Sequence, residues 1–166
     1  HLNLRVQLTP KLKRLNRFNE KKDSSQAIFL GETFMEEFKI SVVIPTLNRK
    51  DFLKKAIDSV LKQKFFPHEI IVVDNLSSDG TLEMINADYP SVKTFVQSIK
   101  GVSATRNLGI RKSEGNWIAF LDSDDQWHNE KLKMQVEHIT EDENQVFLSH
   151  TDETWYRDNE IINQKL

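Results

Sequence analysis

Short apolar runs of strand length alternate along most of the chain with segments whose apolar residues recur at helical spacing. Ile40–Ile44 is apolar and β-branched, and Pro45 is expected to stop this first, central strand because proline cannot donate to a ladder. Lys50–Lys62 follows with apolar residues at helical spacing, and Glu69–Val73 is again a buried strand pattern. This part of the chain therefore predicts a strand, a helix and a second strand.

The same alternation continues toward the C-terminus. We expect helices over Thr81–Ala87, Gly101–Arg111 and Asn129–Ile139, with strands over Val92–Val96, Trp117–Leu121 and Val146–Ser149. A hairpin is expected around Asp158-Asn159, with Trp155, Tyr156, Ile161 and Ile162 in its two strands. Strands that alternate with helices at this spacing form βαβ crossovers, so the fold class is α/β with a mostly parallel central sheet flanked by helices.

The most informative boundary lies where the apolar run Trp117–Leu121 ends in Asp122, Asp124 and Asp125. Carboxylates this close together repel one another, and a hard divalent cation with oxygen ligands offsets that repulsion. The carboxyl end of a strand in an open α/β sheet is also where ligands bind. This stretch therefore predicts a Mg²⁺ or Mn²⁺ and phosphate site, and a solvated turn before an acidic helix start is the alternative.

Three different kinds of site can be tested against single residues. A calcium loop of the EF-hand type would need glycine where Trp127 stands. A phosphatase with a nucleophilic aspartate would need a small hydroxylic or β-branched residue where the chain has Gln126. Pro45–Arg49 follows the first strand without the glycine-rich turn of a dinucleotide site. Each of these sites is therefore disfavoured.

A second polar strand end stands at Asp74 and Asn75, after the run Glu69–Val73. In a parallel sheet the carboxyl ends of the strands share one edge. We therefore expect Asp74 to converge with Asp122–Asp125 on a single crevice. Asp79, a little further along, is expected to cap the next helix rather than to bind a ligand.

Composition narrows the classes of protein that fit this pattern. The 166 residues suit one domain, and 23 basic against 25 acidic side chains give a net charge of −2, so nucleic acid is not expected as a partner. There is no cysteine, which excludes disulfides and thiolate metal sites. No apolar run is long enough for a transmembrane span or a secretory signal, so we expect a cytoplasmic location, with peripheral association at the inner membrane face left open.

Residues 1–37 differ from the rest of the chain, because basic side chains dominate and apolar ones are sparse. We interpret them as a weakly structured N-terminal extension, with a basic arm docking on an anionic surface as the alternative. The chain begins with His1, and Met35 precedes the first strong strand. A natural start at Met35 is therefore a hypothesis.

Four segments together resemble the family 2 glycosyltransferases of the GT-A fold. They are Ile40–Arg49 (ISVVIPTLNR), Ile70–Thr81 (IIVVDNLSSDGT), Gly101–Ile110 (GVSATRNLGI) and Trp117–Trp127 (WIAFLDSDDQW). The resemblance implies that residues 38–166 form the nucleotide-sugar-binding domain of the GT-A fold. It also implies an inverting enzyme that moves a sugar from a nucleotide-diphosphate sugar to an acceptor hydroxyl with the help of Mn²⁺ or Mg²⁺.

The resemblance also assigns roles to individual residues. It implies that Asp124 and Asp125 hold the metal ion, while Asp122 supports or shares these contacts. For Arg106, placed near the nucleotide in the family, a structural ion pair with Asp74 or Asp122 is the alternative. Asn75 stands where many relatives carry a second aspartate, which leaves the base preference open. The full set of implied substrate-binding residues is Pro45, Thr46, Asn48, Asp74, Asn75, Arg106, Asp122 and Asp124.

The general base is the part of the reaction that this sequence does not supply. In relatives it lies in the acceptor-binding half, so we expect it beyond Leu166 and expect the chain to be a C-terminal truncation. His150, Asp152 and Glu153 are the only late candidates. A non-catalytic nucleotide or carbohydrate binding module of the same fold is the alternative to an enzyme. The acceptor, whether glycan, lipid-linked or protein, is not specified.

Overall fold

The computed structural model describes residues 38–141, 148–152, 154–157 and 160–162. The extension predicted over residues 1–37, with Met35, lies outside the described residues. The elements in chain order are β1 (Ile40–Thr46), α2 (Lys50–Leu61), β2 (Glu69–Asp74), α3 (Thr81–Asp88), β3 (Lys93–Val96), α4 (Val102–Lys112), β4 (Trp117–Phe120), α5 (Lys131–Glu141), β5 (Trp155–Arg157) and β6 (Glu160–Ile162).

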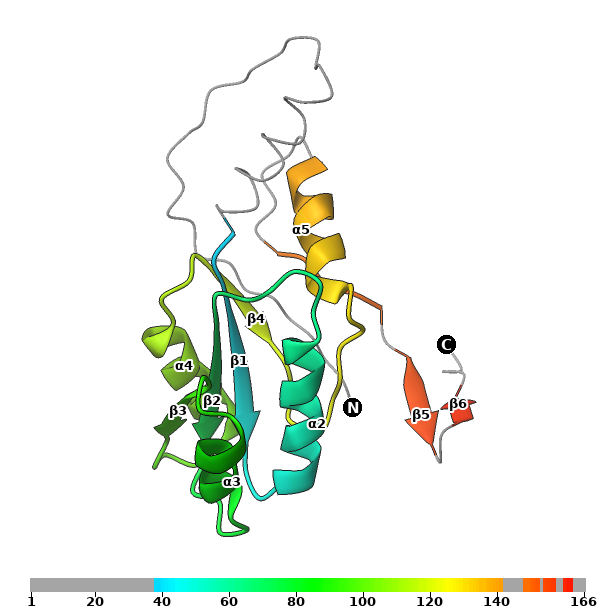
Figure 1. The fold of residues 1–166 in the computed structure, drawn as a ribbon. Helices are drawn as coiled ribbons and strands as arrows, with labels where there is room; N and C mark the ends of the chain where they lie inside the picture. The colour runs from blue at the N-terminus through cyan, green and yellow to red at the C-terminus, as the bar shows by residue number, and fades with distance from the viewer. Residues whose placement is uncertain (1–37, 142–147, 153, 158–159, 163–166) are drawn as a thin grey trace, which may run out of the picture.

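The central sheet has four strands in the order β3-β2-β1-β4, and every neighbouring pair is parallel (Figure 1). The predicted α/β class with a parallel sheet is therefore confirmed. β1 lies between β2 and β4. Because all the strands run the same way, the ends at Asp74 and at Leu121-Asp122 lie at one edge of the sheet, on either side of β1, as predicted.

Pro45 does not stop β1, contrary to the prediction from the sequence, since the strand continues to Thr46. Pairing with β4 ends at Val43↔Phe120, whereas pairing with β2 continues through Pro45↔Val73 to Thr46↔Asp74. The carbonyl of Val43 accepts from Leu121 on the β4 side, so Pro45, two residues on, faces the same side, where no ladder partner remains. The missing proline donor therefore costs no hydrogen bond there.

Each face of the sheet packs its own apolar cluster. On one face, α2, α3 and α5 cover β1, β2 and β4, and the fully buried side chains include Ile44, Leu53, Ile57, Ile85 and Leu132. On the other face α4 packs alone, with Leu108 and Ile110 against the inward side chains of the strands. The sheet is therefore dry on both faces, which is why its strands read as continuous apolar runs in the sequence.

Two predictions fall near the end of the chain. Trp155–Arg157 and Glu160–Ile162 pair antiparallel, which confirms the predicted hairpin, and its turn lies outside the described residues. In Figure 1 the hairpin stands apart from the central sheet. The strand predicted over Val146–Ser149 is not observed at Leu148 and Ser149, whose backbone is irregular, and residues 146–147 are not among those described.

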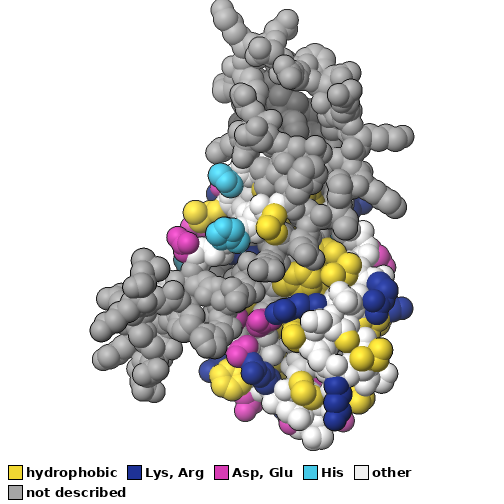
Figure 2. All heavy atoms as spheres, turned by 180° about the vertical axis from the view of Figure 1, so that it is seen from behind, with side chains coloured by type: hydrophobic (Ala, Val, Ile, Leu, Met, Phe, Trp, Pro, Cys, Tyr) yellow, Lys and Arg dark blue, Asp and Glu magenta, His cyan; other side chains and the backbone are white. Residues whose placement is uncertain are grey.

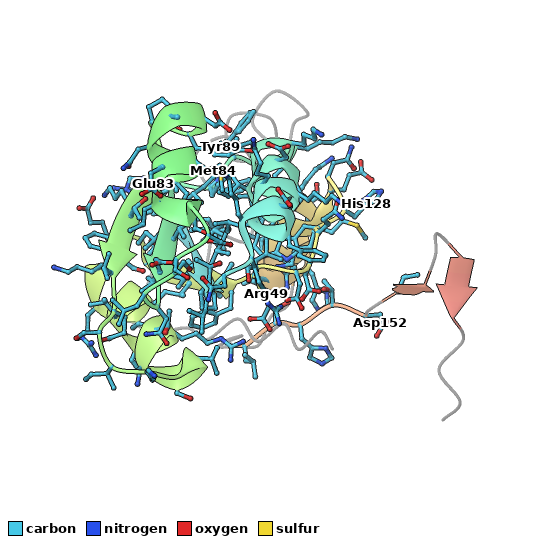
Figure 3. The ribbon with its side chains drawn as sticks, turned by 90° about the horizontal axis from the view of Figure 1, so that it is seen from below. Arg49, Glu83, Met84, Tyr89, His128 and Asp152 are labelled. Carbon is cyan, nitrogen blue, oxygen red and sulfur yellow. The ribbon has the colours of Figure 1, made fainter. Side chains whose placement is uncertain are left out.

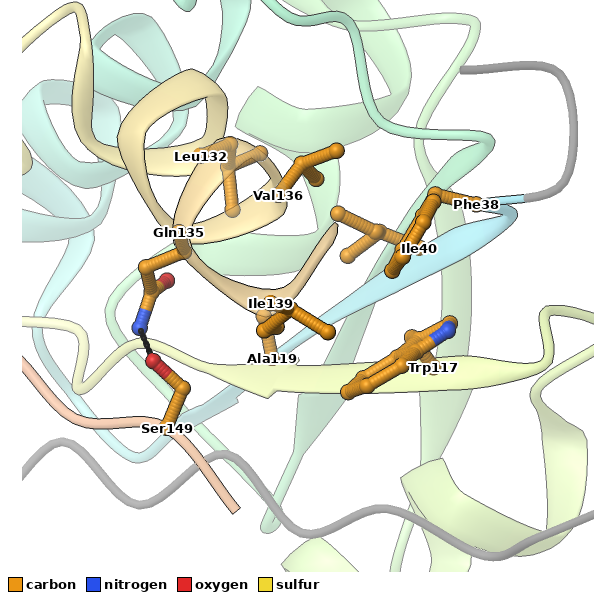
Figure 4. A pocket seen from close by; sticks show the side chains of 9 residues that line it. All are labelled: Phe38, Ile40, Trp117, Ala119, Leu132, Gln135, Val136, Ile139 and Ser149. Atoms are coloured by element: carbon orange, nitrogen blue, oxygen red, sulfur yellow. Dashed lines mark hydrogen bonds between the residues drawn. The ribbon is translucent and has the colours of Figure 1, made fainter. Parts of the chain in front are cut away.

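A small apolar cavity of about 20 Å³ lies beneath α5, at the edge formed by β1 and β4 (Figure 4). Phe38 stacks on Trp117 there, with ring centroids 5.1 Å apart, and Gln135 Nε2 donates to Ser149 Oγ over 3.2 Å. A space of this volume holds no more than a water molecule. It is a packing defect of the core and not a substrate site.

A polar network closes the amino end of the sheet around Glu69, whose side chain is 5% exposed. Its Oε1 accepts from Ser41 Oγ and from the backbone N–H of Glu114, each over 2.6 Å. Its Oε2 lies 2.8 Å from Lys93 Nζ. Burial opposes ionisation, but the contacts with Lys93, Ser41 and Glu114 together lower the pKa of the Glu69 carboxyl.

Replacing this carboxylate is expected to destabilise the fold in a manner that depends on pH. Glu69→Gln should lower the free energy of unfolding by about 1 to 3 kcal/mol near neutral pH, because charge-assisted contacts are lost. A pKa that folding lowers stabilises the native state above the unfolded pKa, and this stabilisation disappears as the pH falls through the folded pKa. Urea unfolding at pH 7 and pH 3.5 measures both values, and a difference from the wild type that stays constant over this range would contradict the assignment.

Candidate nucleotide-binding cleft

A cleft of about 790 Å³ opens at the carboxyl ends of β1, β2 and β4. Its volume falls within the range of small-molecule sites, and its position is where ligands bind in open α/β sheets. Three stretches form its walls, namely the loop after β1, the segment around the start of α4 and the acidic loop after β4. The lining residues are Pro45, Thr46, Leu47, Asn48, Arg49, Asn75, Leu76, Lys100, Gly101, Val102, Thr105, Asp122, Ser123 and Asp124.

Asn48 joins the two loops that follow β1 and β2. Its backbone N–H donates to Ser77 Oγ over 2.8 Å, and its Oδ1 accepts from the backbone N–H of Ser78 over 2.8 Å. Asn48 adopts a positive φ of 51°, a left-handed conformation that asparagine tolerates better than most residues. The predicted binding residue Asn48 therefore lies in the cleft wall and also fixes its shape.

Asp79 provides a second connection between the same loops. Its Oδ2 accepts from the first helical N–H of α2, at Lys50, over 3.0 Å, and its Oδ1 accepts from Thr81 Oγ1 over 2.5 Å. These hydrogen bonds, that to Thr81 first, lower the pKa of the Asp79 carboxyl. Asp79 thus caps helix starts, as the sequence predicts, and it does not line the cleft.

Thr46 and Asp74 lie side by side at the ends of β1 and β2, where they are register partners and point to the same face. Asp74 is fully buried, and its Oδ2 accepts from the backbone N–H of Ser77 over 2.9 Å. Its Oδ1 and the buried Thr46 Oγ1 have no hydrogen-bond partner within the described part of the chain. Thr46 lines the cleft whereas Asp74 does not, so of these two atoms Thr46 Oγ1 is the one at the cleft wall.

Asn75, the residue directly after β2, has its side chain bound entirely within the protein. Its Nδ2 donates to the carbonyls of Gln97, over 2.6 Å, and Ile99, over 3.0 Å. Its Oδ1 accepts from the N–H of Gly101 over 2.9 Å. Asn75 therefore borders the cleft, its predicted role in substrate binding stays a prediction, and its amide is bonded to the segment between β3 and α4.

The acidic loop after β4 is paired with two arginines from different elements. Arg106 on α4 contacts Asp122, with Nη2 2.5 Å from Oδ1, so the ion pair that was the alternative role for Arg106 is present. Arg49, just before α2, pairs with Asp124. Both Asp122 and Asp124 line the cleft, whereas Arg106, a predicted binding residue, does not and contacts it through Asp122. The carboxylates are thus held at the cleft wall by cations that a bound diphosphate would also attract.

Asp125 lies deeper than its neighbours. It is 7% exposed and does not line the cleft, and its backbone N–H donates to the carbonyl of Asp122 over 3.0 Å, which closes the loop. Beneath it, Trp127 belongs to the apolar core, and its backbone N–H donates to Ser59 Oγ over 3.0 Å. The acidic loop is therefore seated on the same core as α2.

Lys131, at the start of α5, is buried over the face of Trp127, with Nζ 3.7 Å from the ring centroid. Burial lowers the pKa of the Lys131 amine to about 7. The sequence alone does not single out this residue, because it follows two polar or charged positions and looks exposed. Only the packing of α5 against Trp127 buries it.

Arg49 and Lys100 are the charged cleft residues that were not predicted from the sequence. A cation directly before a helix N-terminus, as at Arg49, interacts unfavourably with the helix dipole. Its presence there could have indicated that Arg49 pairs with an anionic group outside the helix. Lys100 gives no such signal, because it stands in a polar loop between β3 and α4. Its two neighbours in the chain, Ile99 and Gly101, are both hydrogen-bonded to the Asn75 side chain.

The carboxylate oxygens of the cleft suit a divalent cation that also binds the phosphates of a substrate. Among the residues that the structure describes, no group of three or more His, Cys, Asp or Glu side chains is arranged to hold a metal ion. Mg²⁺ and similar ions are commonly bound by one or two carboxylates together with substrate phosphates and water. Asp122 and Asp124 fit that pattern, and Asp125 stays a predicted ligand.

The late candidates for a general base lie away from these groups. His150 and Asp152 are both exposed, and Glu153 is outside the described residues. Figure 3 looks toward the carboxyl ends of the strands, with Arg49 near the middle of that face and Asp152 to the side, on the segment leading to the hairpin. In this arrangement neither His150 nor Asp152 lines the cleft.

The face seen from behind shows no single charged patch over the described residues. Figure 2 shows the back face, on which basic, acidic and hydrophobic side chains are interspersed. In the described part of the chain, no helix is both long and apolar enough to span a bilayer.

Comparison with known proteins shows which family this chain is similar to. The sequence model for "Glycosyl transferase family 2" matches residues 41–165. The chain is 37% identical over 133 residues to an uncharacterised glycosyltransferase of Rickettsia conorii, covering 79% of this chain and 22% of that protein. It is 35% identical over 104 residues to the Escherichia coli "UDP-Glc:alpha-D-GlcNAc-diphosphoundecaprenol beta-1,3-glucosyltransferase WfgD", covering 61% of this chain and 41% of that one. The chain thus spans less than half of these curated relatives.

Solved structures give the same match at the level of the fold. TarS of S. aureus (residues 1–349) has 32% identity and a TM-score of 0.56 over 62% of this chain and 32% of that one. It has also been solved with UDP and with UDP-GlcNAc, at TM-scores of 0.53. A mannosyltransferase of Pyrobaculum calidifontis, solved with GDP-Man and Mn²⁺, has a TM-score of 0.55 at 18% identity and covers 70% of this chain and 40% of that one, so it supports the fold alone.

Proposed function

The chain belongs to glycosyl transferase family 2 and has the GT-A fold, and we propose that its cleft binds the nucleoside diphosphate of a sugar donor. The proposed reaction is transfer of the sugar to an acceptor hydroxyl with inversion at the anomeric carbon. The observation that carries this proposal is the pairing of two cleft carboxylates, Asp122 and Asp124, with Arg106 and Arg49 at the ends of the parallel strands. Such a cluster can exchange its ion pairs for a cation and a diphosphate.

UDP is the nucleotide that we expect the cleft to prefer. TarS, which resembles this chain at 32% identity, has been solved with UDP and UDP-GlcNAc. In our assignment the unpartnered Thr46 Oγ1 contacts the nucleoside, and Pro45 and Asn48 flank it. Asp74, fully buried beside Thr46, is assigned to the same end of the donor site. The E. coli relative acts on a lipid-linked acceptor, and a cell-envelope acceptor of this kind is our first choice for the whole protein.

The metal ion is assigned to the side of the cleft that carries the acidic loop. A bound Mn²⁺ or Mg²⁺ would supply Lewis-acid stabilisation of the negative charge on the departing diphosphate. Asp124 would contact it first, since its carboxylate faces the cleft, with Asp122 and the buried Asp125 as further predicted ligands. Arg49, once released from Asp124, would stay within reach of the phosphate oxygens.

The described residues support donor binding more directly than they support turnover. Inversion requires a carboxylate or another base that takes the proton of the acceptor hydroxyl on the side opposite the leaving group. No described residue in the cleft is placed opposite the acidic loop as a carboxylate. We therefore assign the base to the acceptor-binding part of the whole protein.

Donor binding is tested by thermal unfolding with a panel of nucleoside diphosphates, each with and without Mn²⁺. A ligand that binds only the native state at 100 times its Kd stabilises it by about 2.7 kcal/mol, which for a domain of this size raises the Tm by several degrees. We expect UDP with Mn²⁺ to give the largest shift. AMP and inorganic phosphate serve as controls, and equal shifts for all the nucleotides, or none for any, would contradict the proposal.

A further inference from the structure

We propose that Asn75 is a positioning residue that sets one wall of the cleft, and that it does not read the nucleotide base itself. This inference rests on the proposed function, because it concerns how the donor site is shaped. It starts from the three hydrogen bonds of the Asn75 side chain, which all end on the segment between β3 and α4.

The three bonds require an amide. Two carbonyl oxygens, those of Gln97 and Ile99, face the Asn75 nitrogen, and one backbone N–H, that of Gly101, faces its oxygen. An amide carries two donor hydrogens on nitrogen and an acceptor on oxygen, so all three groups are satisfied at once. A carboxylate has only acceptors and would meet two carbonyl oxygens without a proton between them.

The position of Asn75 explains why its side chain can make these contacts. Its backbone N–H donates to the carbonyl of Thr46 on β1, and the pairing of β2 with β3 ends at Asp74↔Val96, followed by one bond from the Gln97 N–H to the Asp74 carbonyl. Within the described residues, no strand pairing holds the segment beyond Gln97. Beyond Gln97 the side chain of Asn75 supplies the hydrogen bonds to this segment. Because Asn75 is only 7% exposed, these hydrogen bonds are sheltered from water.

The segment that Asn75 holds has little other support. Gln97 adds two contacts, since its Oε1 accepts from the N–H of Ile99 and its Nε2 donates to the carbonyl of Ala104. Gly101 adopts a φ of 120°, a conformation that other residues rarely take, so the chain turns sharply into α4. Both features are internal to the segment and the start of α4, whereas Asn75 ties the segment to the sheet.

The position of the segment between β3 and α4 matters because its residues form part of the cleft wall. Lys100, Gly101 and Val102 line the cleft, as does the loop that contains Arg49 and, from the acidic side, Asp124. Lys100 is exposed and brings a cation to this wall. A shift of the segment would move Lys100 and the start of α4 together, so Asn75 sets the width and charge of the donor site without needing to touch the donor.

The decisive variant is Asn75→Asp, which places at this position the residue that would read a base directly. If Asn75 positions the wall, Asn75→Asp should weaken UDP binding at pH 8 by about 10-fold or more and should raise hydrogen exchange over residues 97–101. A protonated carboxyl regains one donor, so both defects should diminish as the pH is lowered toward 5. The charged residues next in the chain to Asn75 and to its partners Ile99 and Gly101 are Asp74 and Lys100.

Two further variants complete the test. Asn75→Ala removes all three contacts and should loosen the same segment at every pH, without the recovery at low pH. Asn86→Asp makes the same chemical change at an exposed position on α3 and should leave both readouts as in the wild type.

The outcomes separate this inference from the proposed function. Tight UDP binding by Asn75→Asp with a changed ranking of bases, and unchanged exchange over residues 97–101, would overturn the positioning role. If the wild type binds no nucleotide, the proposed function fails, while hydrogen exchange over residues 97–101 still decides the role of Asn75.

Discussion

Replacing Asp124 by asparagine is expected to abolish the metal-dependent part of nucleoside diphosphate binding. In the wild type, Mn²⁺ should tighten UDP binding, because the cation bridges carboxylate and phosphate oxygens. Asparagine keeps the shape of Asp124 and removes its negative charge. Changes in groups that only orient metal ligands cost about 10- to 100-fold in affinity, so losing a direct ligand should cost roughly 100-fold or more. Isothermal titration calorimetry gives the Kd of UDP with and without Mn²⁺, and the ratio of the two Kd values is the metal effect to be compared between variant and wild type.

Two matched variants make the result specific. Asp74→Ala should weaken UDP binding about equally with and without Mn²⁺, because Asp74 is assigned to the nucleoside and not to the metal. Asp88→Asn removes a carboxylate on α3 that pairs with Lys54, far along the chain from the acidic loop, and should leave the affinity unchanged. Asp124→Asn with an undiminished Mn²⁺ effect would refute the assignment.

Asp125 requires a separate measurement, because it is buried whereas Asp124 lines the cleft. If Asp125 binds the metal when the donor arrives, Asp125→Asn should lower the Mn²⁺ effect as strongly as Asp124→Asn. If Asp125 instead holds the acidic loop against the core, Asp125→Asn should lower the Tm and leave the ratio of UDP affinities with and without Mn²⁺ unchanged. The comparison thus distinguishes a ligand from a support of the loop.

The parallel central sheet was predictable because the alternation of strand and helix patterns implies it. Strands buried on both faces read as unbroken apolar runs, and the crossover rule then places their carboxyl ends on one edge. Asp74 and Asp122 could be placed at one edge of the sheet by this argument alone, although they are far apart in the sequence. Their predicted convergence on a single crevice is not seen, since Asp122 lines the cleft whereas Asp74 is fully buried and does not. Pro45 was misjudged because the cost of a proline depends on which neighbour it faces, and the sequence does not tell where β4 stops pairing.

The partners of the site residues were less predictable. The pairing of Arg49 with Asp124 joins loops on two strands, and no local pattern around Arg49 names that partner. Asn75 was expected to meet the nucleotide, yet all its side-chain hydrogen bonds go to the segment after β3. The partner of a polar side chain depends on which polar groups lie next to it in the folded chain, and residue type alone does not reveal those neighbours.

Gly109→Ala is expected to destabilise the protein although it places the best helix former within α4. Exchanging glycine for alanine inside a helix normally stabilises by about 0.5 to 1 kcal/mol. A Cβ on Gly109, however, would lie well inside contact distance of Val43 Cγ1 and 3.2 Å from its Cγ2. Val43 is fully buried on β1, so it has no room to yield. Overpacking of this kind costs about 1 to 3 kcal/mol, which urea unfolding measures.

The double variant identifies the contact that is responsible. Val43→Ala alone creates a cavity and destabilises, whereas combined with Gly109→Ala it makes room for the added methyl group. The two changes should therefore be non-additive by roughly 1 kcal/mol or more in the favourable direction. Asn107→Ala, on an exposed position of the same helix, should stabilise slightly. Because α4 also carries Arg106 behind Asp122, an additive pair would mean that the helix lies further from β1, and the geometry of the acidic loop would need to be revised with it.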